Sequence, residues 1–310
     1  MKIAISGANG LVGKALAASL RLKDVSVCPV RRVPAAPSND EDNADEIEWE
    51  PDAGLVKPQA VSELDAFVHL AGYSIGNHRW NASEKKKIRS SRVEATRKLA
   101  EQIAELPRPP KAFICASATG IYGERGSETL TEESSPGAGF LAEVAQDWEA
   151  ACSPLVSVGI RVCHARFGIV LAPEAGALRK MLPIFRGYLG APLGGGRQYW
   201  SWISINDCVA GLEHLITSPE SNGIYNLVAP TPETNREFSR KLASALRRPL
   251  LPAPGFATRI GLRLALGEMA DELLLTSCRV VPNRLIAEGF AFQHPQLEDY
   301  LSSVFSCEFQ

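Results

Sequence analysis

The stretch KIAISGANGLVG, from Lys2 to Gly13, joins a short apolar segment to three glycines spaced three residues apart. The apolar segment favours a buried β-strand, and the apolar spacing after the last glycine fits a helix. Between a strand and a helix, the first glycine permits a tight turn and the second lets backbone approach a pyrophosphate. The third lets the helix pack close to the strand. We therefore predict a dinucleotide-binding turn, in which Asn9, Leu11 and Val12 join Gly7, Gly10 and Gly13. A purely structural glycine turn is the alternative.

The rest of the N-terminal half alternates apolar strands with helices. Apolar stretches at 25–30, 66–72 and 111–117 predict buried strands, and NASE (Asn81 to Glu84) has capping-box spacing that opens a helix to about Leu106. Continuous apolar strands separated by helices indicate a parallel sheet covered on both faces. We therefore predict an α/β fold, a Rossmann doubly wound parallel sheet with a smaller mixed C-terminal lobe.

The second half of the chain is less regular and sets the expected domain boundaries. The expected elements are a helix over 139–151, a strand over 160–171, a helix over 206–216 and a strand over 223–229. The last strand is expected to rejoin the main sheet. We therefore assign residues 1–171 and 205–229 to the Rossmann domain, and residues 172–204 and 230–310 to the C-terminal lobe.

Charge and composition narrow the classes of partner. The net charge of −2 implies no overall attraction to nucleic acid or to an acidic membrane, and the longest apolar runs are far shorter than a membrane span. The seven cysteines include no CxxC pair and the five histidines do not cluster, so we expect free thiols, no metal site and a reducing compartment. Because a strand starts at once, with no signal sequence before it, we expect a cytoplasmic protein.

The end of the second strand bears on the choice of cofactor. An acidic residue there would bind the ribose 2′-hydroxyl of NAD, whereas an arginine accommodates the 2′-phosphate of NADP. Arg31 and Arg32 follow Val30, and the next carboxylate in the sequence is Asp40. A guanidinium suits a phosphate well, so we predict NADP (NADPH) as the cofactor rather than NAD. Two solvent-facing loop arginines are the alternative.

Several motifs together resemble the extended short-chain dehydrogenase/reductase superfamily, and more narrowly its atypical epimerase-like family with a characteristic C-terminal domain. The glycine spacing is joined by HLAG (from His69), SATGIYG (from Ser117) and WISINDCVAGL (from Trp202). RW at Arg79, SRVEAT from Ser91, WE at Trp148 and the C-terminal VVPNRLIAEGFAFQHPQLEDYL from Val280 add to the match. The resemblance covers almost the whole chain.

The resemblance implies further cofactor contacts. Leu70, Ala71 and Gly72 occupy the position where backbone passes the adenosine ribose and pyrophosphate. Arg92 stands where the superfamily has a cofactor-contacting Asn, and either binds a phosphate or ribose or is a helix surface charge. The segment from Arg166 to Val170 matches the backbone that holds the nicotinamide amide.

The catalytic residues that the resemblance implies are incomplete. Related enzymes use Tyr-x-x-x-Lys as acid and base, but no tyrosine here has a lysine four residues later, and Phe140 or Leu141 falls near the tyrosine's position. The remaining candidates are Ser117, Thr119 and Tyr122, with a hydroxyl-lined strand end as the alternative. An unperturbed tyrosine makes a poor base without a cationic neighbour.

The substrate side is less specific. Arg197, Tyr199, Trp200 and Trp202 either form an aromatic platform with a cationic anchor or pack between lobes. Two functions remain open: an NADP-dependent oxidoreductase or epimerase acting on a small polar substrate, and a weakly catalytic NADP(H)-binding sensor or interaction protein. We expect a small-molecule partner, no nucleic acid and no membrane, and we leave a homodimer open.

Overall fold

The computed structural model describes residues 1–33 and 46–306. The chain divides into two compact units, which are described separately. Unit 1 comprises residues 1–117, 144–165 and 209–224, and unit 2 comprises residues 118–143, 166–208 and 225–310. Residues 34–45, which include Asp40, lie outside the described residues.

A sheet of eight strands carries the predicted phosphate turn. The strand order is β12-β8-β6-β5-β1-β2-β3-β4, and β1 pairs in parallel with both β5 and β2. The strands are β1 (Lys2–Ser6), β2 (Ser26–Arg32), β3 (Ile47–Glu50), β4 (Gly54–Leu55), β5 (Ala66–His69), β6 (Ala112–Ala118), β8 (Arg161–Phe167) and β12 (Gly223–Leu227). The order reverses at β1, because the chain adds β2 on one side and β5 on the other. The carboxyl ends of these two parallel pairs therefore flank the turn, which is where open α/β sheets bind ligands.

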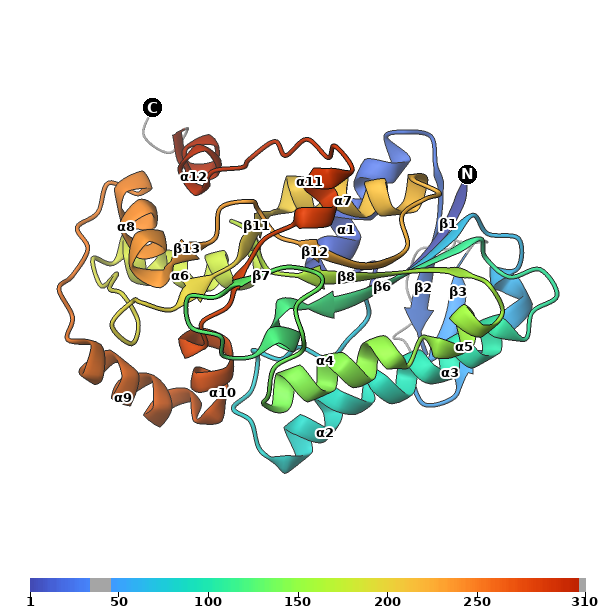
Figure 1. Ribbon diagram of the computed structural model, residues 1–310, viewed down its shortest axis with the longest axis horizontal. Coiled ribbons are helices and arrows are strands. Elements are labelled where there is room, and N and C mark those ends of the chain that lie inside the picture. Colours follow the sequence, from blue (N-terminus) through green and yellow to red (C-terminus); the bar gives the residue numbers. More distant parts are fainter. Residues whose placement is uncertain (34–45, 307–310) are drawn as a thin grey trace. The chain divides into compact units, whose positions relative to one another are not determined.

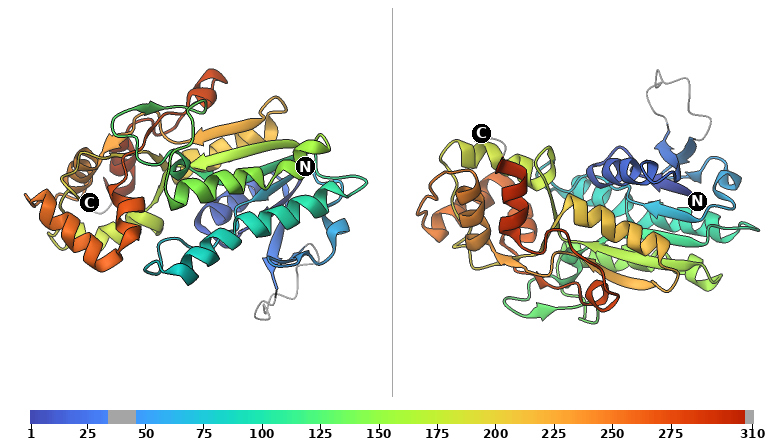
Figure 2. Two further views of the ribbon diagram at one scale, coloured as in Figure 1. Left: turned by 60° about the horizontal axis from the view of Figure 1, so that its bottom comes forward. Right: turned by 90° about the horizontal axis from the view of Figure 1, so that it is seen from above.

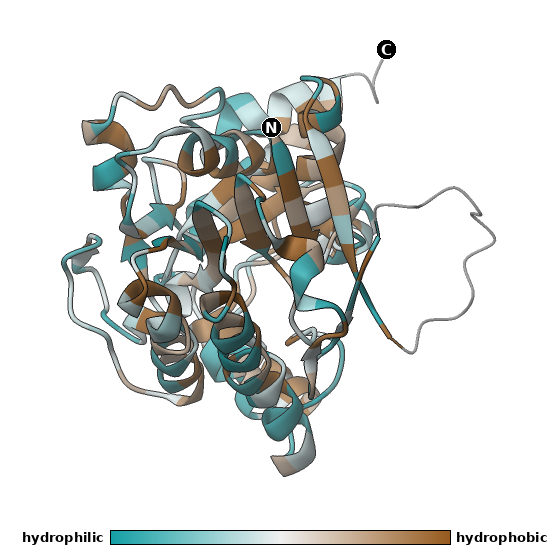
Figure 3. Ribbon diagram, turned by 90° about the vertical axis from the view of Figure 1, so that its right-hand side faces the viewer, coloured by the Kyte–Doolittle hydropathy of each residue, from teal (hydrophilic) through white to brown (hydrophobic). Residues whose placement is uncertain are grey.

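Helices cover both faces of the sheet in unit 1, as the sequence predicts. Figures 1 and 2 show α1 and α7 on one face and α3 and α5 on the other. Their bounds are α1 (Leu11–Arg21), α3 (Val93–Ala104), α5 (Ser153–Ser157) and α7 (Ile205–Thr217), with the 3-10 turn η1 at Pro58–Val61. Figure 3 shows the strands as mostly hydrophobic between helices that carry hydrophilic stripes. The α/β fold with a large parallel sheet is confirmed.

The long helix expected from Asn81 to about Leu106 is divided. It forms α2 (Ala82–Ser90) and α3, which are separated at Ser91 and Arg92. The start was predicted correctly, because the Asn81 side chain accepts a hydrogen bond of 2.9 Å from the Glu84 amide. The break places the Arg92 side chain beside the loop that follows β5, which matters for the candidate site.

The strand expected over 160–171 is also divided. It becomes β8 and β9 (Ile169–Ala172), with Gly168 between them. A Cβ at Gly168 would lie 2.6 Å from the Ser201 carbonyl oxygen, so only glycine permits this close approach. β9 then pairs in parallel with β11 (Trp202–Ser204) instead of extending the main sheet.

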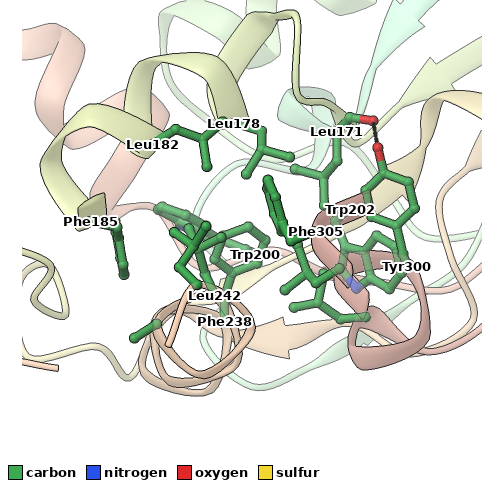
Figure 4. Packing of buried hydrophobic residues seen from close by; sticks show 14 of the residues in the cluster. Leu171, Leu178, Leu182, Phe185, Trp200, Trp202, Phe238, Leu242, Tyr300 and Phe305 are labelled. Atoms are coloured by element: carbon green, nitrogen blue, oxygen red, sulfur yellow. Dashed lines mark hydrogen bonds between the residues drawn. The ribbon is translucent and has the colours of Figure 1, made fainter. Parts of the chain in front are cut away.

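Unit 2 has its own hydrophobic core. Trp200, Trp202 and Phe238 are almost fully buried there, and Tyr300 donates a hydrogen bond of 2.6 Å to the Leu171 carbonyl (Figure 4). Its strands outside the main sheet are β7 (Thr129–Leu130), β9, β10 (Tyr199–Trp200), β11, β13 (Glu233–Thr234) and β14 (Arg279–Val280). Its helices are η2 (Thr119–Tyr122), α6 (Gly176–Arg186), α8 (Asn235–Ala245), α9 (Gly255–Leu266), α10 (Glu268–Ala270), η3 (Asp271–Leu275), α11 (Asn283–Ala287) and α12 (Leu297–Phe305). Helix α4 (Phe140–Ala150) starts in unit 2 and ends in unit 1.

The unit boundaries differ from the expected domain boundaries. Residues 118–143, 166–171, 205–208 and 225–229, which were expected in the Rossmann domain, belong to unit 2. Segments that leave the sheet after β6 and β8 therefore pack with the C-terminal half of the chain. In the described part of the chain, no helix has both the length and the apolar character that a membrane crossing requires.

Candidate functional site

The turn after β1 in unit 1 depends on its glycines. Gly7 has a φ of +72°, and a Cβ there would lie 2.8 Å from the Leu70 carbonyl carbon. Gly10 donates a hydrogen bond of 2.9 Å to the Gly7 carbonyl, which closes the turn. A Cβ on Gly13 would lie only 2.2 Å from the same oxygen. Because no side chain caps α1, the amides of its first turn remain available to a phosphate.

Arg92 places a partly buried positive charge beside the loop that follows β5. Its Nη1 donates to the carbonyl oxygens of Tyr73 at 3.0 Å and Ile88 at 3.2 Å, and its guanidinium lies 5.2 Å from the Trp148 ring. A Cβ on Gly72 would come within 3.3 Å of this guanidinium. Burial lowers the pKa of Arg92 to about 10, so it stays charged at neutral pH. No carboxylate in residues 1–33 or 46–306 pairs with it, so an anion in this loop would compensate a partly buried charge.

The two arginines of the second strand point to opposite faces of the sheet. Both lie inside β2, not after it, because β2 pairs with β3 as far as Arg32 and Trp49. Arg31 is drawn to two carboxylates, Glu46 at 2.8 Å and Glu48 at 3.4 Å. Arg32 is exposed, and among the described residues it forms no ion pair. The expectation that both arginines follow the end of the strand is therefore wrong, and Arg32 is the more exposed of the two.

Ser117 and Glu149 form a short hydrogen bond in unit 1. The Ser117 hydroxyl, at the end of β6, donates to Glu149 Oε1 at 2.6 Å, and the serine is only 2% exposed. The neighbouring Trp148 donates through Nε1 to Thr96 Oγ1 at 2.9 Å. The WE motif of α4 thus directs an indole toward α3 and a carboxylate toward the end of β6. Ser117 has an acceptor that the sequence did not predict.

Tyr122 is enclosed in unit 2. Its hydroxyl lies 2.9 Å from Arg166 Nη1, 2.8 Å from Asn226 Oδ1 and 2.9 Å from the Thr131 carbonyl oxygen, and its side chain is fully buried. Burial raises the pKa of Tyr122, although Arg166 opposes the shift. This environment favours a structural role over acid–base chemistry. Thr119, also in unit 2, is only partly buried.

The segment from Arg166 to Val170, which the resemblance assigns to the nicotinamide amide, lies in unit 2. The Arg166 guanidinium is used in the buried network, so a cofactor contact from this residue would come from its main chain, as the resemblance implies. Val170 lies in β9, paired with Ile203 of β11, and is partly buried.

A cavity of about 700 Å³ lies within unit 2. Arg197 and Tyr199 line it, together with Leu141 near the start of α4. Trp200 and Trp202 do not, because their side chains are 5% and 0% exposed and belong to the core. The predicted aromatic platform is therefore wrong for both tryptophans, which pack in the core of unit 2 itself.

Comparison with known proteins identifies the family. The sequence model of the NAD dependent epimerase/dehydratase family matches residues 3–227. The chain belongs to this family. A second model, described as a domain of unknown function, matches residues 254–304. The C-terminal extension predicted from the motif that starts at Val280 is therefore part of a recognised domain.

Relatives of this epimerase/dehydratase family member span its whole length. An epimerase family protein of Mycobacterium leprae is 43% identical over 302 residues, which cover 97% of this chain and 94% of the relative. The crystal structure of a human epimerase family protein with NADPH shares 30% identity and a TM-score of 0.85, covering 99% of both chains. A nucleoside-diphosphate sugar epimerase from Corynebacterium glutamicum shares 31% identity and a TM-score of 0.78, covering 97% of this chain and 57% of that one.

In this epimerase/dehydratase family member, two features of the site escaped sequence analysis. Glu149 is the second residue of the WE motif, but nothing in the spacing of the sequence indicated Ser117 as its hydrogen-bond partner. Cys115, Cys152 and His164 bring their donor atoms within 4.8 Å of one another, contrary to the expectation of dispersed residues. Burial raises the pKa of the Cys115 thiol.

The buried His69 side chain should make the free energy of unfolding depend on pH. Its ring nitrogens lie 2.6 Å from Ser6 Oγ and 3.0 Å from Thr96 Oγ1, and burial lowers its pKa to about 4. An unfolded histidine titrates near 6.5, so between these values the unfolded chain binds a proton that the folded chain does not. The free energy of unfolding should therefore fall by about 2 kcal/mol through this group between about pH 7.5 and pH 5.

Urea unfolding at both pH values measures this loss. His69→Gln should reduce the loss, because the titrating group is gone, whereas His78→Gln on the exposed loop should leave it unchanged. An equal pH dependence in the unmodified chain and His69→Gln would contradict the assignment.

Proposed function

We propose that this chain binds NADP(H) in preference to NAD(H) and uses it in an oxidoreductase or epimerase reaction on a small polar substrate. The observation that carries the proposal is the exposed Arg32 at the end of β2, next to a glycine turn with an open helix N-terminus. The NADPH in the human relative supports the same choice. Arg92 supplies a second, partly buried cation for the cofactor's phosphates or ribose.

Replacing the arginines one at a time tests the phosphate contact. Arg32→Ala should weaken NADPH binding at least about tenfold, because a charge-assisted hydrogen bond contributes about 1.5–3 kcal/mol. NADH binding should change little. Arg31→Ala is the matched control: its guanidinium is already paired with Glu46, so the loss should be smaller. Calorimetric titration measures both, and a larger effect from Arg31→Ala would contradict the assignment.

The Ser117–Glu149 pair offers a proton route that does not need the missing dyad. During oxidation of an alcohol, the substrate hydroxyl gives its proton to the Ser117 oxygen while Ser117 gives its own proton to Glu149. NADP⁺, when bound, would accept the hydride from the same carbon, so the carbonyl product would form with charge balanced. The reverse sequence reduces a carbonyl. The 2.6 Å hydrogen bond supports this direction of transfer.

A substrate screen separates the two functions that the sequence leaves open. Carbonyl compounds and sugar nucleotides are offered to the protein with NADPH, and oxidation of the cofactor is followed by its absorbance. Turnover that disappears in Ser117→Ala supports the enzyme. Tight NADPH binding without turnover on the whole panel favours the sensor, which the buried Tyr122 and the missing Tyr-x-x-x-Lys motif also support.

We also propose that the protein works in a reducing compartment such as the cytoplasm. The six described cysteines are free thiols, and five of them are buried. Free buried thiols are typical of proteins from reducing compartments.

A further inference from the structure

Helix α9 of unit 2 (Figure 1) carries an exposed apolar stripe. Phe256, Ile260 and Leu264 are spaced four residues apart, so they follow one another along one face of the helix. Their side chains are 72%, 56% and 73% exposed, and none of the residues from 255 to 266 is buried. A continuous apolar stripe on a surface helix marks a site for another protein or for a membrane.

The loops that follow α6 and α8 place further apolar side chains next to α9. Tyr188 and Leu251 are both exposed. The Leu251 amide donates a hydrogen bond of 2.8 Å to the Gly190 carbonyl, which joins the two loops. The first loop then reaches α9, where the Gly194 amide donates to Thr258 Oγ1 at 3.0 Å. The stripe and the two loops are therefore neighbours within unit 2.

Exposed apolar side chains and positive charge are both concentrated in these segments. Of the thirteen large hydrophobic side chains that are exposed in the described part of the chain, seven lie at 184–189 or 251–264. Residues 175–197 and 245–272 carry eight basic and three acidic side chains, an excess of five positive charges. The whole chain has a net charge of −2, so this part of unit 2 differs from the rest.

Arginines border the apolar side chains directly. On α9, Arg259 and Arg263 each follow a residue of the stripe by three positions, which puts them at its edge. Arg263 binds Asp271 at 2.8 Å, whereas the exposed Arg259 forms no ion pair with any described residue. In the loops, the Arg248 guanidinium lies 4.7 Å from the Tyr188 ring, and within residues 1–33 and 46–306 it has no carboxylate partner either. The surface thus combines exposed apolar groups with uncompensated guanidiniums.

We propose that this surface, which we call the α9 surface and which comprises α9 with residues 186–190 and 248–251, binds an anionic lipid bilayer. A helix that lies in the headgroup region buries its apolar face at the acyl boundary, while its arginines meet the lipid phosphates. A second copy of the chain fits less well, because it would bring the same arginines against one another. The expectation of no membrane partner rests on the net charge of the whole chain, which averages over this local excess.

Flotation of the full chain with lipid vesicles tests the proposal. Vesicles of phosphatidylcholine alone are compared with vesicles of equal parts phosphatidylcholine and phosphatidylglycerol. At low salt the anionic vesicles should bind the protein at least about tenfold more tightly, because several arginines contribute at the charged surface. Raising the salt concentration should narrow this difference.

Single substitutions separate the apolar contribution from the charged one. Phe256→Ala and Leu264→Ala should each weaken binding to the anionic vesicles about tenfold, because each removes a side chain that the bilayer would bury. Arg259→Ala should weaken it about fivefold. The matched controls are Ile286→Ala on α11, where the side chain is 51% exposed, and Arg97→Ala on α3, which is also exposed. Both controls should bind like the unmodified protein.

Three results would overturn the proposal. They are equal binding to the two kinds of vesicle, anionic binding that neither Phe256→Ala nor Leu264→Ala weakens, and a dimer in sedimentation that Phe256→Ala dissolves while no vesicle binding is seen. Urea unfolding should give every variant the midpoint of the unmodified chain, so that lost binding is not lost folding. NADPH affinity should also stay unchanged in these variants, which keeps this test independent of the proposed function.

Discussion

Gly13→Ala is expected to lower NADPH affinity at least about tenfold and to destabilise the fold by about 1–3 kcal/mol, the range for overpacked sites. The added Cβ would lie 2.2 Å from the Gly7 carbonyl oxygen and 2.9 Å from the Ala8 Cα. All of these neighbours are backbone atoms, so relief requires the turn to move. The same Gly7 oxygen accepts the hydrogen bond from Gly10, and a displaced turn no longer presents the amides of α1 to a pyrophosphate.

A second glycine-to-alanine change separates this steric effect from helix propensity. Gly261 lies in α9, and a Cβ there would meet nothing within 4 Å. Gly261→Ala should therefore stabilise by up to about 1 kcal/mol, the usual gain of alanine over glycine in a helix. Urea unfolding and calorimetry with NADPH are measured on both variants. If Gly13→Ala also gains stability and keeps its NADPH affinity, the close-packed turn is not what the cofactor site requires.

Trp202→Ala should cost about 3–5 kcal/mol of unfolding free energy, the range for removing a fully buried aromatic side chain. Trp202 is 0% exposed, donates through Nε1 to the Thr231 carbonyl at 2.9 Å, and stacks on Tyr300 with ring centroids 6.2 Å apart. The variant leaves a large cavity and also leaves the Thr231 carbonyl without this donor.

Phe256→Ala is the matched control, because Phe256 is 72% exposed on α9. Its effect should stay within about 0.5 kcal/mol, as for most surface changes. Urea unfolding measures both variants. A loss below about 1 kcal/mol for Trp202→Ala would show that this side chain does not support the core, and would reopen the aromatic platform that the sequence first suggested.

Local sequence signals predicted the parts of the fold that depend on neighbouring residues. The strand, turn and helix from Lys2 to Arg21 are encoded by apolar spacing and by three glycines. A Cβ on Gly10 or Gly13 would crowd the Gly7 carbonyl oxygen within the turn, and Gly7 itself has a positive φ. The start of α2 follows from a cap between Asn81 and Glu84, which are only three residues apart in the sequence. The sequence therefore identified the turn that the cofactor site requires.

Contacts between distant residues explain where the sequence predictions failed. Arg31 and Arg32 looked equivalent, but pairing with β3 places Glu46 and Glu48 beside Arg31 alone. Because strand residues alternate between faces, neighbours in the sequence can have opposite environments. No pattern within β2 carries that information.

The candidate catalytic residues show the same limit. The end of β6 was predicted to gather hydroxyl groups, yet Ser117 meets Glu149 from a position 32 residues later. Tyr122 is removed from solvent by Arg166 and Asn226, which are 44 and 104 residues away. Long-range hydrogen-bond partners therefore determine the environment of each hydroxyl, and they cannot be read from spacing along the chain.

The central claim is that the chain selects NADPH, and calorimetric titration of the unmodified protein with NADPH and NADH tests it most directly. We expect NADPH to bind at least about tenfold more tightly, because its 2′-phosphate adds nearly two negative charges where Arg32 ends β2. The difference should shrink as salt is raised, since Arg32 is exposed and its charge is screened. Equal affinities for NADPH and NADH at low salt would contradict the account.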